Sequence, residues 1–208
     1  MGRTGDGEAL PQRLLAVATR LFAEKGFEKT SVQEIVEAAG VTKGAMYHYF
    51  AAKDDLLQEI YQRLLRMQRE RLEAIMARDQ PVALRLRAAA ADVVVTAIAN
   101  LDDATIFLQS MHLLPADRRR AVRAARREYH ERFRALVEEG QHAGTFRADV
   151  PADLAVDYFF GAVHHLGAWF RTDGRLTAEQ VGAHFADLLL SSLRPDPPAD
   201  ARPSREQG

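Results

Sequence analysis

The sequence predicts an all-α protein, with an N-terminal three-helix domain containing a helix-turn-helix, a larger C-terminal helical domain and about nine helices in all. Three observations predict this class. Ala, Leu, Arg and Glu dominate the 208 residues, and apolar residues recur at helical spacing. No segment alternates apolar and polar residues in the way of a half-buried strand.

Composition narrows the class further. Apolar residues make up 47% of the chain, which is enough for a sizeable core, and the absence of cysteine excludes disulfides and cysteine zinc sites. A formal net charge of -1 gives no overall attraction to polyanions. No apolar run approaches the ~20 residues of a membrane span, and the N-terminus has no signal-peptide core. We therefore expect a soluble cytoplasmic protein without a membrane partner, cofactor or metal.

The first predicted helix covers residues 10–25, where apolar residues repeat on one face. Gly26 follows its last turn and Phe27 follows the glycine, an order typical of a left-handed C-cap with an apolar residue folding back. A second short helix begins after Ser31, because Ser31 and Glu34 form a capping box.

The second helix ends at Gly40, and Thr42 caps a third helix that runs through Phe50. Later helices are predicted over 53–78, 83–100, from 102 or 103, from 115 to before 144, from 151 to about 171, and after a Thr177 cap. The predicted domains are an N-terminal arm (1–9), a helix-turn-helix domain (10–52), a ligand-binding and dimerisation domain (53–193) and a disordered tail (194–208).

The two short helices around Gly40 predict a DNA-reading helix-turn-helix. The second of them presents its N-terminus, with small residues that allow close approach to a groove and with side chains that reach phosphates. From Ala38 to Lys53 there is no acidic residue, although the chain has more carboxylates than cations. A solvated helical hairpin is the alternative. The predicted DNA-binding residues are Ser31, Thr42, Lys43, Gly44, Ala45, Tyr47, His48 and Lys53.

The stretch "TSVQEIVEAAGVTKGAMYHYFAAKDDLL" resembles the DNA-binding motif of the TetR family of bacterial transcriptional repressors. The resemblance covers about residues 10 to 58, and Thr42 stands where the family commonly has serine. It implies a homodimer, with a divergent C-terminal domain that holds a ligand pocket. Ligand binding would shift the two DNA-binding domains apart and release the operator DNA.

The last two predicted helices are the candidate dimer interface, because residues 153–170 are apolar nearly all round. Two such helices from each subunit can form a twofold four-helix bundle, although they could also be the core of a monomer. The predicted interface residues are Tyr158, Phe159, Ala162, Leu166, Val181, Phe185, Leu188 and Leu189.

The candidate ligand site consists of large or polar-tipped residues on apolar helices, although core packing explains each of them too. Adjacent His164 and His165 do not form a metal site, since neighbouring helical residues point about 100° apart. The predicted ligand-binding residues are Phe107, Met111, His112, Tyr158, His164, His165 and Trp169.

The segment "AWFRTDGRLTAEQVGAHFADLLLSSL" weakly resembles the C-terminal end of TetR-family regulators of lipid and sterol degradation, several of which respond to acyl-CoA thioesters. An acyl-CoA effector would need cations for its phosphates. Six arginines between 118 and 127, together with Arg171, are candidates, although a solvated helix face is the alternative.

Two other function classes stay open. A helical-bundle enzyme would need Glu and His paired across helices, and "EYHER" and "EEGQH" only bring these residues near one another in sequence. A non-specific architectural DNA-binding protein should be strongly basic, and this chain is not. The sequence does not decide between repressor and activator, or between a dimer and a pair of dimers on DNA.

Overall fold

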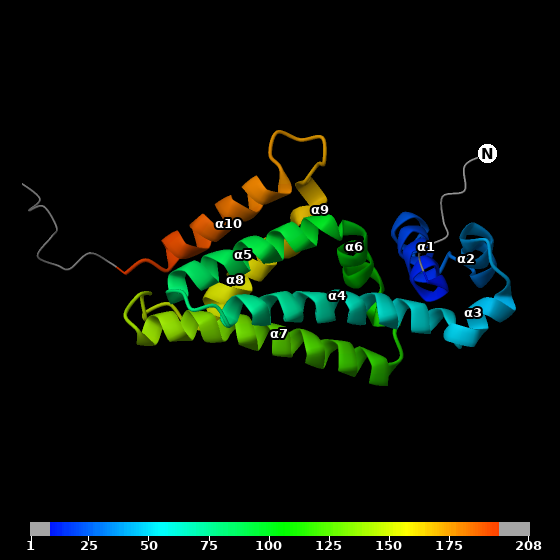
Figure 1. Ribbon diagram of the computed structural model, residues 1–208, viewed down its shortest axis with the longest axis horizontal. Helices are drawn as coiled ribbons and strands as arrows, with labels where there is room; N and C mark the ends of the chain where they lie inside the picture. Colours follow the sequence, from blue (N-terminus) through cyan, green and yellow to red (C-terminus); the bar gives the residue numbers. More distant parts are fainter. Residues whose placement is uncertain (1–8, 196–208) are drawn as a thin grey trace, which may run out of the picture.

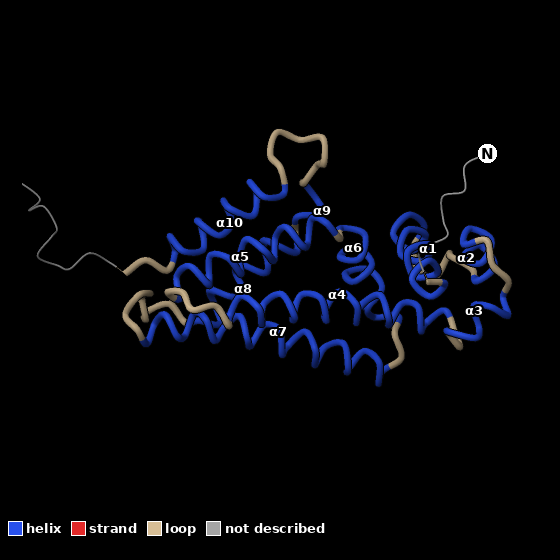
Figure 2. The backbone as a smooth tube through the Cα atoms, in the orientation of Figure 1, coloured by secondary structure: helices blue, strands red, loops and turns tan. Residues whose placement is uncertain are grey.

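The computed structural model describes residues 9–195, and within that range it consists of helices and loops without a strand, which confirms the all-α prediction (Figures 1 and 2). The predicted arm and tail lie outside the described residues, apart from positions 9, 194 and 195. The elements are α1 Leu10–Lys25, α2 Val32–Ala39, α3 Lys43–Tyr49, α4 Lys53–Met76, α5 Val82–Ala99, α6 Leu101–Ser110, the 3-10 turn η1 Met111–Leu113, α7 Ala116–His142, α8 Ala152–His164, α9 Leu166–Trp169 and α10 Ala178–Ser192.

The predicted caps determine where the first helices begin and end. Gly26 has a φ of 87° and a ψ of 152°, so its backbone is one that favours glycine but lies outside the predicted left-handed helical region. Phe27 nevertheless folds back as expected, with its ring 5.0 Å from that of Phe22. Gly40 is left-handed, with a φ of 65°, and both Ser31 and Thr42 cap the helices that follow them.

Buried apolar side chains form two clusters. Figure 1 shows α1, α2 and α3 at one end of the molecule, and α5, α8 and α10 towards the other. The head core joins α1, α2 and α3 to the first half of α4, and includes Ile106, Leu114 and Val122 from later in the chain. The body core joins the second half of α4 to α5, α7, α8 and α10. Helix α4 therefore belongs to both clusters, and the domain boundary at residue 53 stays a prediction.

One predicted helix is broken in the structure. The eighth was expected to run to about residue 171, but α8 ends at His164 and the single turn of α9 follows. His165 has a φ of -90° and a ψ of -2°, and its amide donates to Ala162 instead of continuing the α-helical pattern. Gly167, a poor helix former, follows two residues later. The turn buries Leu166 and Phe170 and leaves Trp169 exposed.

Two glycines allow close packing in the body. A β-carbon at Gly140 on α7 would lie 2.0 Å from the ring of Phe146, which is buried against this helix. A β-carbon at Gly182 on α10 would lie 2.9 Å from the carbonyl oxygen of Ala91 on α5. Both contacts require glycine, so these positions determine how closely the body elements approach. Within residues 9–195, none of the helices is both long and apolar enough to span a bilayer.

Candidate DNA interface and effector cavity

The predicted DNA-reading helix, α3, lies at the outer end of the head (Figure 1). Lys43, Gly44, Tyr47 and His48 are exposed, and Ala45 is partly so. On the opposite side of the helix, Met46 is fully buried in the head core. The exposed face therefore carries one full positive charge, two ring side chains and a small residue, a combination that can lie close to a polyanion.

The two cap hydroxyls shape this end of the molecule. The Thr42 hydroxyl oxygen accepts from the amide of Ala45 at 3.2 Å, and the Ser31 hydroxyl oxygen accepts from the amide of Glu34 at 3.1 Å. The Glu34 carboxylate accepts from Lys25 at 2.8 Å and from the Ser31 amide at 2.8 Å. These bonds lower the pKa of Glu34 to about 2, and the bond from Lys25 has the largest effect. Direct DNA contact by Ser31 and Thr42 stays a prediction.

Lys53 has a second role that the sequence did not reveal. Its ammonium donates to the carbonyl oxygens of Phe27 at 2.8 Å and Thr30 at 2.9 Å, and lies 4.2 Å from the centre of the Phe27 ring. Partial burial lowers its pKa. Lys53 therefore ties the start of α4 to the loop between α1 and α2, and its contact with a phosphate stays a prediction.

A cavity of about 80 Å³ lies in the body between α4, α5, α6, α7 and α8. Its apolar walls are contributed by five helices, so no single segment of sequence marks it. Its apolar lining residues are Leu64, Leu65, Val93, Ala97, Ala104, Tyr129, Phe160 and Val163.

The polar lining residues of the cavity are Arg126, His130 and His164 on α7 and α8, with Gln68 on α4 and Asn100 at the end of α5. The Arg126 guanidinium lies 3.1 Å from Nε2 of His164, and the His130 ring stacks on Phe160 with centroids 4.0 Å apart. Burial, and next the charge of Arg126, lower the pKa of both histidines to about 4. At neutral pH each imidazole is therefore uncharged, with one N–H that can donate.

A surface groove of about 600 Å³ shares Arg126 and His130 with this cavity. Arg123, Arg127 and Arg134 add positive charge to its lining, but Glu131, Asp153 and Asp157 line it too. Arg134 already donates to Asp153 at 2.9 Å. The groove therefore offers cations beside the cavity, in a mixed rather than uniformly positive setting.

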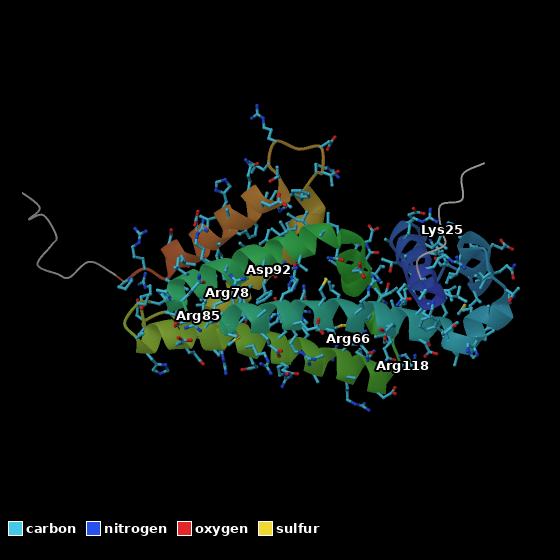
Figure 3. The ribbon with its side chains drawn as sticks, viewed as in Figure 1. Lys25, Arg66, Arg78, Arg85, Asp92 and Arg118 are labelled. Atoms are coloured by element: carbon cyan, nitrogen blue, oxygen red, sulfur yellow. The ribbon has the colours of Figure 1, made fainter. Side chains whose placement is uncertain are left out.

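The predicted arginine cluster divides along α7. Arg118 pairs with Asp55 on α4 at 2.5 Å, and Arg119 donates to the carbonyl oxygen of His112 at 3.0 Å. Arg123, Arg126 and Arg127 face the groove, whereas Arg120 and Arg171 are exposed elsewhere. Figure 3 shows Arg118 near the end of α7 closest to the head.

The predicted ligand-binding residues do not gather in one place. His164 lines the cavity and Met111 lines the groove, but Tyr158 is 72% exposed, and His112, His165 and Trp169 are also exposed. The side chain of Phe107 lies outside the described part of the structure. His130 and Phe160 were not among the predicted ligand-binding residues, and Arg126 was predicted only as one of the candidate cations for an acyl-CoA effector. Helical spacing could have grouped these residues, because residues 126 and 130, like residues 160 and 164, are one turn apart and share a helix face.

The predicted dimer residues also divide into two groups. Phe159, Leu166, Val181 and Leu189 are buried within the single chain, so they are body core. Tyr158, Ala162 and Leu188 are exposed, and Phe185 is partly so. Leu154, which the prediction omitted, is exposed one turn before Tyr158 on α8. The exposed members form apolar faces on α8 and α10.

Three contacts connect α4 to the helices of the body near the head. The Tyr61 hydroxyl donates to the carbonyl oxygen of Ile106 at 2.9 Å, and Arg63 pairs with the buried carboxylate of Asp103 at 3.1 Å. The third is the pair of Arg118 with Asp55, whose carboxylate also accepts from the amide of Ala52 at the start of α4. In residues 9–195, no group of three or more His, Cys, Asp or Glu residues could hold a metal ion.

Comparison with known proteins gives two family matches. Residues 14–60 match the family described as "Bacterial regulatory proteins, tetR family". Residues 79–193 match "Tetracyclin repressor-like, C-terminal domain". Together they cover the head and the body.

Individual relatives agree with these matches. The transcriptional repressor KstR2 of Rhodococcus jostii is 28% identical over 185 residues, which cover 86% of this chain and 89% of the relative. The regulator PfmR from Thermus thermophilus superposes with a TM-score of 0.79 at 32% identity, covering 86% of this chain and 97% of that one. AibR, solved in complex with isovaleryl coenzyme A and operator DNA, superposes with a TM-score of 0.76 at 26% identity, covering 90% and 99%.

Proposed function

The chain belongs to the TetR family of bacterial transcriptional regulators, and we propose that it is a homodimeric repressor which a small amphipathic effector releases from a palindromic operator. It is a ligand-responsive DNA-binding regulator. The observation that carries the proposal is that one helix, α4, contributes both to the head core and to the cavity. Its first half packs in the head core, and its residues Leu64 and Leu65 line the cavity. A molecule in the cavity would touch the helix on which the head is mounted.

For the DNA side, we propose that α3 enters the major groove, with Lys43 and Tyr47 on phosphates and Gly44 and Ala45 allowing close approach. The exposure of this face over buried Met46 supports the assignment. One such short helix reads only a few base pairs, so a twofold operator read by two copies follows. Residues 10–52 would then form the DNA-binding domain of a cytoplasmic protein.

For assembly, we propose that the exposed faces of α8 and α10 pair around a twofold axis. Tyr158 is 72% exposed and Leu188 is 69% exposed, and single chains rarely leave apolar side chains grouped in this way. Tyr158→Asp and Leu188→Asp should each shift the protein from dimer to monomer in sedimentation velocity. Leu84→Asp, at an exposed leucine on α5, is the matched control and should leave the dimer intact.

For the effector, we propose an acyl-CoA thioester with the acyl group in the cavity and the phosphates near the groove arginines. The supporting feature is that Arg126 and His130 line both spaces, since the cavity is mostly apolar and the groove bears cations. The isovaleryl coenzyme A bound to AibR agrees with this chemistry. Arg123 and Arg127 are the proposed phosphate partners.

The test has two stages. Duplexes selected from a random DNA pool should contain an inverted repeat, and a site without one would contradict the dimeric reading. CoA thioesters and uncharged hydrophobes are then titrated into the protein–operator complex. A coupling of ~1–3 kcal/mol, a 5- to 150-fold loss of operator affinity, is the expected response to a thioester. Release by an uncharged hydrophobe alone would remove the arginines from the ligand site.

A further inference from the structure

The size of the cavity limits what it can hold. Its volume is about 80 Å³. An engineered apolar protein cavity of ~150 Å³ holds one benzene molecule, with six carbon atoms. About half that space corresponds to roughly three to five carbon atoms once small adjustments of the walls are allowed.

The aromatic part of the wall resists enlargement because its rings pack on one another and on Phe133. Phe160 stacks on His130 and also lies 5.3 Å from Phe133 and 5.9 Å from Tyr129, ring centroid to ring centroid. Val93, a lining residue on α5, is 2% exposed. Moving any one of these side chains would displace several others, and packed interiors oppose such changes.

The polar groups fix which end of a ligand enters. Arg126 and His130 belong to both the cavity and the groove, so they mark the junction of the two spaces. A carbonyl oxygen at this junction can accept from the guanidinium and from a neutral imidazole N–H. A chain beyond the carbonyl that enters the cavity then lies against Leu64, Val93 and Ala97.

We propose that the cavity selects a short, compact acyl group of about three to five carbon atoms, and rejects long-chain and fused-ring acyl groups. The inference rests on the proposed function, because it specifies the effector of the same site. It names a chemical class for the effector, short or branched acyl thioesters, and assigns the selection to residues of the cavity.

Direct binding tests the inference without needing the operator sequence. Free CoA and a series of thioesters, from acetyl through isobutyryl and isovaleryl to hexanoyl, octanoyl and a steroid-derived acyl group, are titrated into the full-length protein by calorimetry. Each buried methylene should tighten binding about fourfold, so isovaleryl-CoA should bind about 60-fold tighter than acetyl-CoA. Affinity should then fall for octanoyl and for the steroid-derived thioester.

Two variants move the optimum in opposite directions. Ala97→Leu fills the cavity and should shift the optimum to acetyl-CoA, while Ala99→Leu, two residues along on the exposed side of α5, should leave the series unchanged. Leu64→Ala removes three carbon atoms from the wall and should shift the optimum towards hexanoyl. Because Leu64→Ala enlarges the cavity, it keeps the test decisive if Ala97→Leu does not fold, as judged by circular dichroism.

The outcomes separate the two proposals. An affinity that rises steadily to octanoyl, or tightest binding of the steroid-derived thioester, would overturn the size inference and leave the acyl-CoA effector standing. Equal binding of every thioester and free CoA would show that the acyl group does not enter the cavity, which also overturns the inference. If neither CoA nor any thioester binds, the proposed effector class is itself wrong, and the selection inferred from it fails too.

Discussion

The functional residues of the head lie close together in the sequence, whereas those of the body lie far apart in it. In the head, Ser31, Gly40 and Thr42 cap helices that begin or end within a few positions of them. The exposed residues of α3 all lie within one helix of 7 residues. In the body, the cavity is built from five helices, and its polar groups are separated by 38 positions between Arg126 and His164. A surface made by neighbouring residues can be predicted from the sequence, whereas a cavity forms only when distant helices pack together.

The largest expected difference between the two regions is their response to acid. The pKa of His130 and of His164 is lowered to about 4 in the folded chain, from an ordinary value of 6.5. Between these values the unfolded state binds more protons, so the stability of the body falls as pH drops from 6.5 to 4. We expect a loss of roughly 2 kcal/mol for each histidine, allowing for their partial exposure.

In the head, the pKa of Glu34 is also lowered, to about 2 from 4.5. Its contribution is present above pH 4.5 and is lost only as pH falls towards 2. Hydrogen exchange measured across a pH series should therefore show the body loosening first. Loosening of the head at pH 5 to 6, before the body, would contradict the assignment.

The next largest effect concerns packing in the body. Gly140→Ala places a methyl group on the ring of Phe146, and we expect a loss of about 3 kcal/mol in the free energy of unfolding, since overpacking typically costs 1–3 kcal/mol or more. Urea unfolding measures it. Gly167→Ala is the control: it also lies in a helix, where the nearest contact of a β-carbon would be the Thr105 hydroxyl oxygen at 3.9 Å, and alanine should be neutral or slightly stabilising.

A smaller effect on stability is expected at the base of the head. Lys53→Met keeps the length of the side chain but removes the ammonium from two carbonyl oxygens, which should cost about 1–2 kcal/mol. Lys43→Met is the matched control at an exposed lysine. If Lys53→Met leaves the unfolding midpoint unchanged while weakening DNA binding, its main partner is a phosphate.

The smallest effect on stability, and the sharpest on function, is expected for Lys43→Ala. The residue is exposed, so stability should change within about 0.5 kcal/mol. If Lys43 neutralises a phosphate, the salt slope of operator binding should fall by about one unit. Tyr47→Phe should weaken binding without that change of slope. An unaltered slope and affinity in Lys43→Ala would remove it from the contact surface.

Prediction from sequence follows the same division. The limits of α1 and both helix-turn-helix caps were predicted, because capping and glycine conformation are local. The break at His165 was missed, since it depends on burying Leu166 and Phe170 in the body. For the same reason the ligand list included Tyr158 and omitted His130: apolarity along a helix does not say which neighbour will cover each face.

The length of α4 determines how far its Lys53 end moves when the helix tilts. Its 24 residues span about 36 Å at 1.5 Å per residue. Leu64, where α4 lines the cavity, lies 11 residues or about 17 Å from Lys53, so a rotation of only ~5° about this point would carry the Lys53 end through roughly 1.5 Å, about half the length of a hydrogen bond. In the proposed dimer, such a tilt of α4 in each chain would change the separation of the two heads. An effector of a few carbon atoms would need to alter the packing around Leu64 by only a fraction of an ångström to change the spacing between the two heads.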